Sequence, residues 1–121
     1  MFSNGMNRRY DDFMKEADPR VQPLMDSLRK FCFSLGSNVV EDVRMHRVVF
    51  CKSFAFRWFV DVEPWKLYKS ATVLLKIRMS RTETHTCEIV LNEDLDGNIS
   101  WSSQQMEAIQ WGIREAYNYI H

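Results

Sequence analysis

Apolar residues recur every three or four positions in two stretches near the N-terminus, which is the spacing of helices with one buried face. The first stretch follows Asn7, a candidate N-cap, and ends before Asp18–Pro19. The second runs from Val21 to Leu35, and Gly36 follows it as a candidate helix-ending residue. The sequence therefore predicts two N-terminal helices. Residues 1–6 show no periodicity, and we expect them to be disordered.

The apolar period changes to two between residues 39 and 91, where β-branched and aromatic residues become frequent, as in strands. Residues 39–50 are expected to form one bent strand or two short ones. Alternation is clearer over 53–62 and 71–79, and a last strand covers 87–91. In the 53–62 strand the residues expected on one common face are Phe54, Phe56, Trp58 and Val60. The other faces mix apolar and charged residues, which favours an antiparallel sheet of about four strands with one wetter side.

A closing helix is predicted after Ser102, because Ser102 and Gln105 fit a capping box. Its expected inner stripe is Met106, Ile109, Ile113, Tyr117 and Ile120. Trp111 and Tyr119 lie off this stripe. The order of elements predicts an α+β fold, with two N-terminal helices and one C-terminal helix packed on one face of the sheet. No linker or repeat interrupts the chain, so residues 1–121 are expected to form one domain.

Composition and charge limit the class of protein. The chain is 45% hydrophobic, which excludes intrinsic disorder, and no apolar run reaches the length of a membrane span. Its 16 basic and 16 acidic residues cancel, so bulk charge does not support binding to nucleic acid or to a membrane, although a local patch stays open. The three cysteines are few and widely spaced, which predicts free thiols in a cytoplasmic protein.

The strongest candidate for a contact surface is the segment 63–69, which is expected to be a loop between two strands. It carries aromatic residues and lysines where loops are usually small and polar. The candidate binding residues are Trp65, Lys66, Tyr68 and Lys69. In the alternative interpretation, Trp65 and Leu67 fold back and cover one end of the core. Trp111 and Tyr119 form a second candidate surface on the closing helix.

A basic rim is a further expectation for the same region of the chain. Its members would be Arg44, Arg47, Lys52 and Arg57. Nearby acids offset them, namely Glu41, Asp42, Asp61 and Glu63. A groove in which aromatic residues alternate with these bases is the alternative that would bind nucleic acid.

The sequence predicts no metal site and no cofactor. Residues 92–99 resemble the first part of a calcium loop, but Ser103 stands where the closing carboxylate is required, so an acidic turn is expected. The nitrogen and sulfur ligands His46, Cys51, His85 and Cys87 lack the paired spacing of zinc sites. A thiol-dependent enzyme remains an alternative, in which Cys51 or Cys87 with a lowered pKa would meet a histidine.

Four segments resemble a widespread prokaryotic family whose domain has no known function and some of whose members are labelled predicted transport proteins. These segments are Pro23–Arg29 leading through Leu35–Gly36 into Val39–Glu41, Val48–Phe50 followed by Phe54–Ala55, Glu88–Leu91, and Glu115–Tyr117. The family often has a glycine before its late strand, whereas residues 80–86 contain none. The resemblance implies a compact α+β domain, sometimes appended to nuclease or restriction proteins, and assigns no catalytic residue.

Taken together, the residues predict a small binding or interaction module, and we expect its partner to be a protein. The alternatives are a nucleic-acid-associated accessory domain of a defence or nuclease system, and the thiol-dependent enzyme.

Overall fold

The computed structural model describes residues 8–54, 56–67 and 70–120, and they form an α+β fold. Five antiparallel strands make one sheet whose spatial order equals their order in the chain. Their bounds are β1 (Val39–Val43), β2 (Val48–Lys52), β3 (Trp58–Leu67), β4 (Ser70–Arg78) and β5 (Thr84–Val90). The helices are α1 (Tyr10–Glu16), the 3₁₀ turn η2 (Pro19–Val21), α2 (Gln22–Ser34) and α3 (Ser103–Tyr119). A small second sheet pairs β6 (Asn92–Glu93) with β7 (Ile99–Ser100).

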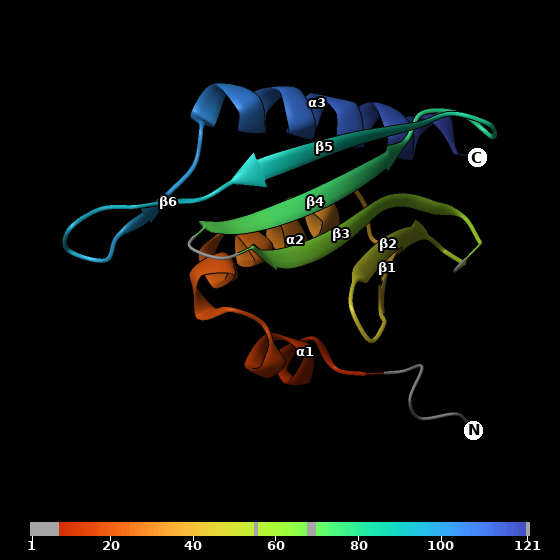
Figure 1. The fold of residues 1–121 in the computed structure, drawn as a ribbon. Helices are drawn as coiled ribbons and strands as arrows, with labels where there is room; N and C mark the ends of the chain where they lie inside the picture. Colours follow the sequence, from red (N-terminus) through yellow and green to blue (C-terminus); the bar gives the residue numbers. More distant parts are fainter. Residues whose placement is uncertain (1–7, 55, 68–69, 121) are drawn as a thin grey trace.

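The predicted fold class is confirmed, with five strands instead of about four. The extra strand arises because residues 39–50 form two strands, β1 and β2, joined by a short turn. In Figure 1, α2 lies behind β3 and β4, while α3 runs along β5. The helix α1 begins at Tyr10, and the expected cap Asn7 and the expected disordered residues 1–6 lie outside the described residues.

The strand predicted from Ser53 begins five residues later, at Trp58. Ser53 has a φ of 70°, which turns the chain out of the strand path, and Lys52 and Arg57 then pair through a 2.9 Å hydrogen bond from the Lys52 N–H to the Arg57 carbonyl. Phe54 and Phe56 are therefore exposed and do not share a buried strand face with Val60. A β-bulge follows, so that Phe59 and Val60 are both fully buried.

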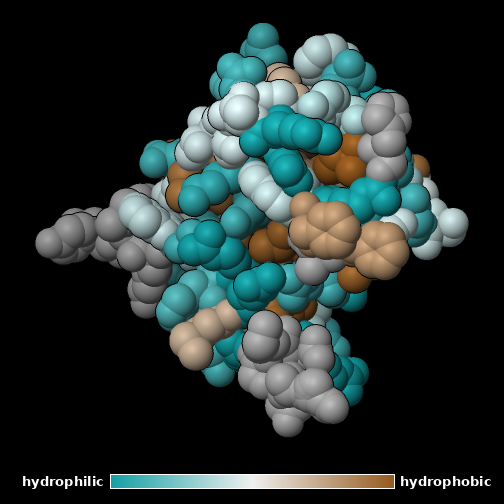
Figure 2. Space-filling model, turned by 90° about the vertical axis from the view of Figure 1, so that its right-hand side faces the viewer, coloured by the Kyte–Doolittle hydropathy of each residue, from teal (hydrophilic) through white to brown (hydrophobic). Residues whose placement is uncertain are grey.

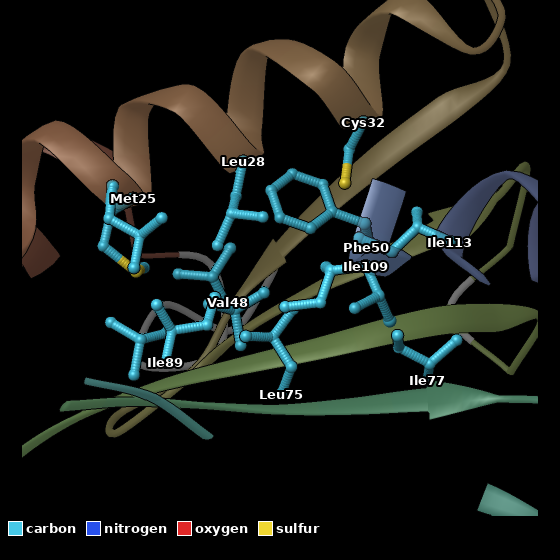
Figure 3. Packing of buried hydrophobic residues seen from close by; sticks show 14 of the residues in the cluster. Met25, Leu28, Cys32, Val48, Phe50, Leu75, Ile77, Ile89, Ile109 and Ile113 are labelled. Carbon is cyan, nitrogen blue, oxygen red and sulfur yellow. The ribbon is translucent and has the colours of Figure 1, made fainter. Parts of the chain in front are cut away.

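The core lies between the helices and one face of the sheet. Figure 3 shows side chains of α2 and α3 converging on side chains of the strands. The labelled residues are Met25, Leu28, Cys32, Val48, Phe50, Leu75, Ile77, Ile89, Ile109 and Ile113, and all are buried. The apolar side chains that recur with a period of 3.6 in the helices and of 2 in the strands thus pack together in one cluster.

Two capping predictions have different outcomes. Ser102 caps α3 as expected, because its hydroxyl accepts from the Gln105 N–H at 3.1 Å. The Gln105 amide, however, donates to the Glu88 carbonyl of β5 at 2.7 Å. Gly36 does not adopt the positive φ of a helix-ending glycine. Its small size matters for another reason, since a Cβ there would overlap the hydroxyl of Tyr117.

Candidate functional site

The segment predicted as a loop is mostly strand. Residues 63–67 continue β3, and their pairing with β4 extends to Leu67 opposite Ser70, so the loop prediction is wrong for these residues. Glu63–Pro64 suggests a turn, but both residues lie within β3, because the alternation of apolar residues continues past them. Tyr68 and Lys69 lie outside the described residues, and the structure describes the backbone of Lys66 but not its side chain.

Trp65 lies on the strand with 42% of its surface exposed. Its indole N–H donates to a Glu63 carboxylate oxygen at 3.1 Å. The ring lines an open groove of about 610 Å³ with residues from α1 and the β1–β2 turn. The other lining residues are Phe13, Glu16, Ala17, Met45, His46, Glu63 and Pro64. Trp65 is thus not fully buried over the core, and the residues around it do not form a basic loop.

The expected basic rim is divided between the two ends of the sheet. At the β1–β2 turn, Arg44 pairs with Asp42 at 2.8 Å, and Arg47 pairs with Asp61 at 3.1 Å and lies 3.8 Å from Glu63. We call these five residues the ion-paired end. Their charges compensate one another, so this part of the predicted rim offers no excess positive charge.

Lys52 lies at the opposite end of the sheet, where it holds the C-terminus of α3. Its ammonium group donates to the Ile120 carbonyl at 2.6 Å and to the Tyr117 carbonyl at 3.3 Å. It also lies 4.4 Å from the centre of the Tyr117 ring. A cation at this position compensates the unpaired carbonyls and the dipole of the helix end, so Lys52 has a structural role.

Arg57, the last member of the expected rim, lies in a hollow that sequence analysis missed. Because neighbouring strands are antiparallel, the β2–β3 turn and the β4–β5 turn lie at the same end of the sheet, beside the end of α3. Between them is a hollow of about 360 Å³ lined by Phe56, Arg57, Arg78, Arg81, Tyr119 and Ile120. We call these residues the arginine hollow. Its lining contains three arginines and no acidic residue.

The central arginine of this hollow, Arg78, has neutral partners. Arg78 donates to the carbonyls of Phe56 at 3.1 Å and of Trp58 at 3.4 Å, and its guanidinium lies 5.5 Å from the centre of the Trp58 ring. Among ion pairs between described residues, none involves Arg57, Arg78 or Arg81. Within the described part of the chain, no carboxylate thus forms an ion pair with these three arginines, in contrast to Arg44 and Arg47.

Two exposed rings lie at the arginine hollow, and one of them, that of Phe56, is part of its lining. Phe54 and Phe56 are 56% and 76% exposed, and their rings are stacked, with centroids 5.8 Å apart and an angle of 8° between the planes. We call them the phenylalanine pair. Figure 2 views this end of the molecule and shows a group of hydrophobic side chains standing out from a mostly hydrophilic surface. An exposed pair of large apolar rings beside three cations is a feature typical of binding surfaces.

Hydrogen bonds order the backbone in the described parts of both turns. In the β2–β3 turn, the Ser53 N–H donates to the Asn38 carbonyl at 2.8 Å and the Arg57 N–H donates to the Phe54 carbonyl at 2.9 Å. In the β4–β5 turn, the Met79 N–H donates to the Glu83 carbonyl at 2.9 Å and the Ser80 hydroxyl accepts from the Glu83 N–H at 3.1 Å. The surface is therefore built on fixed turns at the end of a rigid sheet.

The second predicted surface, Trp111 and Tyr119, is also divided by the structure. Both rings are exposed, but only Tyr119 lines the arginine hollow. Trp111 lies along a separate, mostly apolar groove of about 330 Å³ between α3 and the edge strand β5, which it shares with His85 and Cys87. The hypothesis that these two aromatic residues form one surface therefore has no support in the geometry.

The segment that resembles a calcium loop forms a hydrogen-bonded turn. Asp94 accepts N–H groups of Asp96 at 2.9 Å and Asn98 at 2.8 Å, and hydrogen bonds from Asn98 lower the pKa of Asp94, as in an acidic turn. Within the part of the chain that the structure describes, no three His, Cys, Asp or Glu side chains cluster as a metal site would require.

None of the three cysteines has the lowered pKa that a reactive thiolate needs. Burial raises the pKa of Cys51 to about 11 and also raises that of Cys32 and of Cys87. His85 and Cys87 do line the same groove. Burial of the sulfur nevertheless favours its protonated form, which is a poor nucleophile.

Searches of protein-family models, curated proteins and solved structures found nothing that matches the chain. The resemblance to a prokaryotic family stays a prediction, and no residue takes a role from it. No helix in the described ranges is both long enough and apolar enough to cross a membrane.

Proposed function

We propose that this protein is a binding module for anionic ligands and that the arginine hollow is its contact surface. One observation carries the proposal. Arg57 from the β2–β3 turn, Arg78 from the end of β4 and Arg81 from the turn after it line one hollow without an acidic residue, although the chain has as many acidic as basic residues. An uncompensated group of guanidinium ions is unfavourable in the free protein and becomes favourable when an anion binds.

The geometry suits arginine chemistry. A guanidinium group has five N–H donors in a planar fork, which match the oxygens of a phosphate or a carboxylate. Two backbone carbonyls fix Arg78 but leave it further donors, while Arg57 and Arg81 flank it from the two turns. Because Arg78 is already ordered, less side-chain entropy is lost when it binds a ligand.

The Trp65 surface supports a binding function less well. Its groove is open and mostly apolar, and the two carboxylates that line it, Glu16 and Glu63, already interact with Arg8 and Arg47. Nothing there selects the chemistry of a partner. The interaction with a protein partner through Trp65 remains a prediction from the sequence, and the arginine hollow takes its place as the proposed contact surface.

Titration with inorganic tripolyphosphate, followed by isothermal calorimetry, tests the proposal. The Arg57→Gln/Arg81→Gln variant should bind at least about tenfold more weakly, because each charge-assisted hydrogen bond contributes roughly 1.5–3 kcal/mol. Arg78 is left intact because it also holds the β2–β3 turn.

The matched control removes two positive charges elsewhere. Arg9, the N-cap residue of α1, and Lys15 within α1 are both exposed, and neither lines the hollow. Lys15 makes an exposed contact with Asp12 at 3.6 Å. Arg9→Gln/Lys15→Gln should bind tripolyphosphate as the unmodified protein does. An equal loss in both variants would show that net charge alone attracts the anion, and the proposed surface would be wrong.

A further inference from the structure

We infer that the anionic ligand is a single-stranded nucleic acid whose bases stack on the phenylalanine pair while its phosphates contact the arginine hollow. This inference rests on the proposed function and adds the chemical class of the ligand. Its starting point is the position of Phe56, whose ring belongs to the stacked pair and whose side chain also lines the hollow. Apolar rings and positive charge thus form one continuous surface.

The exposed rings are the first argument for a base-containing ligand. Phe54 and Phe56 leave 56% and 76% of their surfaces in water, although rings of this size are usually buried. Their planes are nearly parallel, so the stack can be extended by another flat ring. Stacking on aromatic side chains is the main way in which proteins hold unpaired bases of any sequence.

The spacing of the two chemistries is the second argument. In a single strand, bases and phosphates alternate along the chain, so a suitable protein surface places stacking rings beside cations. Here Arg57 follows Phe56 directly in the turn, and Arg78 donates to the Phe56 carbonyl at 3.1 Å. A duplex hides the faces of its bases, and an acidic peptide offers carboxylates without flat rings. The phenylalanine pair therefore favours a ligand with unpaired bases over both of these.

The backbone strain at Ser53 is the third argument. A serine with a φ of 70° adopts the left-handed conformation that usually belongs to glycine. This residue turns the chain so that Phe54 leaves the sheet instead of continuing its buried face. Strained residues persist where the surrounding structure fixes them, and they are frequent at binding surfaces. The turn therefore presents the pair in a prearranged position, which reduces the entropic cost of binding.

Fluorescence anisotropy with two labelled probes tests the inference. One probe is an oligothymidylate of about twelve nucleotides, within the usual range of single-strand sites, and the other is an abasic deoxyribose phosphate chain of the same length and charge. The unmodified protein should bind the oligothymidylate at least about tenfold more tightly, because only this probe can stack on the rings.

Two variants assign this preference to the rings. Phe54→Leu/Phe56→Leu keeps the surface apolar but removes the aromatic faces, and it should lower affinity for the oligothymidylate at least about tenfold while affinity for the abasic chain stays unchanged. Trp111→Leu is the control, since it removes an exposed ring that lies in a different groove on α3. It should change neither affinity. Circular dichroism melting of each variant checks that the fold is intact.

The outcomes separate this inference from the proposed function. Equal affinity of the unmodified protein for both probes would overturn the nucleic-acid inference and leave the anion-binding function standing. Binding to poly-glutamate but to neither probe would also overturn it, in favour of an acidic protein partner. If tripolyphosphate, both probes and poly-glutamate all fail to bind, the proposed function falls as well. An unchanged preference in the leucine variant would show that the phenylalanine pair is not the stacking surface.

Discussion

The two ends of the sheet use the same residue type, arginine, in opposite ways. At the ion-paired end, Arg44 and Arg47 have carboxylate partners at 2.8 and 3.1 Å. At the arginine hollow, the bonding partners of Arg78 among the described residues are two carbonyls and a ring. Ion pairs within the chain neutralise the arginines of the first surface. In our proposal, the positive charge of the second surface binds an anionic ligand. A neutral protein can therefore carry a strongly basic site when its charges are segregated.

The ends also differ in what stabilises them. Tertiary contacts near the arginine hollow are made mainly by rings and carbonyls, including the edge-on contact of Phe59 with Tyr117, whose centroids are 5.4 Å apart. At the ion-paired end the arginines are 49% and 39% exposed, and ion pairs with such exposed partners contribute little to stability. The following four predictions test this difference, from the largest effect to the smallest.

Phe59→Ala should lower the free energy of unfolding by about 3–5 kcal/mol, since Phe59 is fully buried and its ring packs on α3. Arg47→Ala, at the ion-paired end, should cost less than about 1 kcal/mol. Urea denaturation of both variants measures the two values. If the Arg47 variant lost as much stability as the Phe59 variant, ion pairs would be the main support of the fold.

Trp65→Ala should cost about 1–2 kcal/mol, because the 42% exposed ring buries only part of its apolar surface in the free protein. The affinity for oligothymidylate should not change, as Trp65 lies outside the arginine hollow. Denaturation and anisotropy on the same preparation measure both quantities. A loss of binding without a loss of stability would show that Trp65 belongs to the contact surface.

Lys52→Met should cost about 1 kcal/mol, since it removes a cation that binds the two carbonyls at the end of α3. Lys76→Met is a suitable control, because Lys76 lies mid-strand on β4 and is only partly buried. Binding of oligothymidylate should be the same in both variants. Weaker binding in the Lys52 variant alone would place Lys52 in the ligand surface and contradict its structural role.

Asp61→Asn/Glu63→Gln should change stability by less than about 1 kcal/mol and should release Arg47 from its partners. In a background that carries Arg57→Gln/Arg81→Gln together with Phe54→Leu/Phe56→Leu, these changes should restore part of the affinity for tripolyphosphate. The two labelled probes should then bind equally, because the new positive charge has no phenylalanine pair beside it. A preference for oligothymidylate would assign a stacking role to Trp65.

The sequence predicts the framework of the fold well but not the site. The helical stripes and most of the alternating strands are where the patterns place them, because burial in one core determines both periods. The alternation through Phe54, Phe56 and Trp58 is misleading, because the positive φ of Ser53 changes the direction of the chain. No local pattern distinguishes an exposed phenylalanine from a buried one next to such a residue.

The arginine hollow could not be found from spacing along the chain. Arg57 lies in the β2–β3 turn, whereas Arg78 ends β4 and Arg81 lies in the turn after it. Only the antiparallel register of β3 and β4 brings them together. Tyr119 was identifiable as an aromatic residue off the inner stripe of α3, and Arg57 as part of a basic region. For Arg78 and Arg81, the signal in the sequence is their position at or just after the end of a strand.

The order of the strands has a kinetic consequence. Every strand of the large sheet pairs with its neighbour in the chain, so each pairing closes only a short loop. We therefore expect the sheet to assemble by successive hairpins without a slow search between distant segments. Contacts that close much longer loops join Asn38 to Tyr117 and Lys52 to Ile120. Docking of α3 is accordingly expected to come late in folding, and the arginine hollow would be completed only at that step.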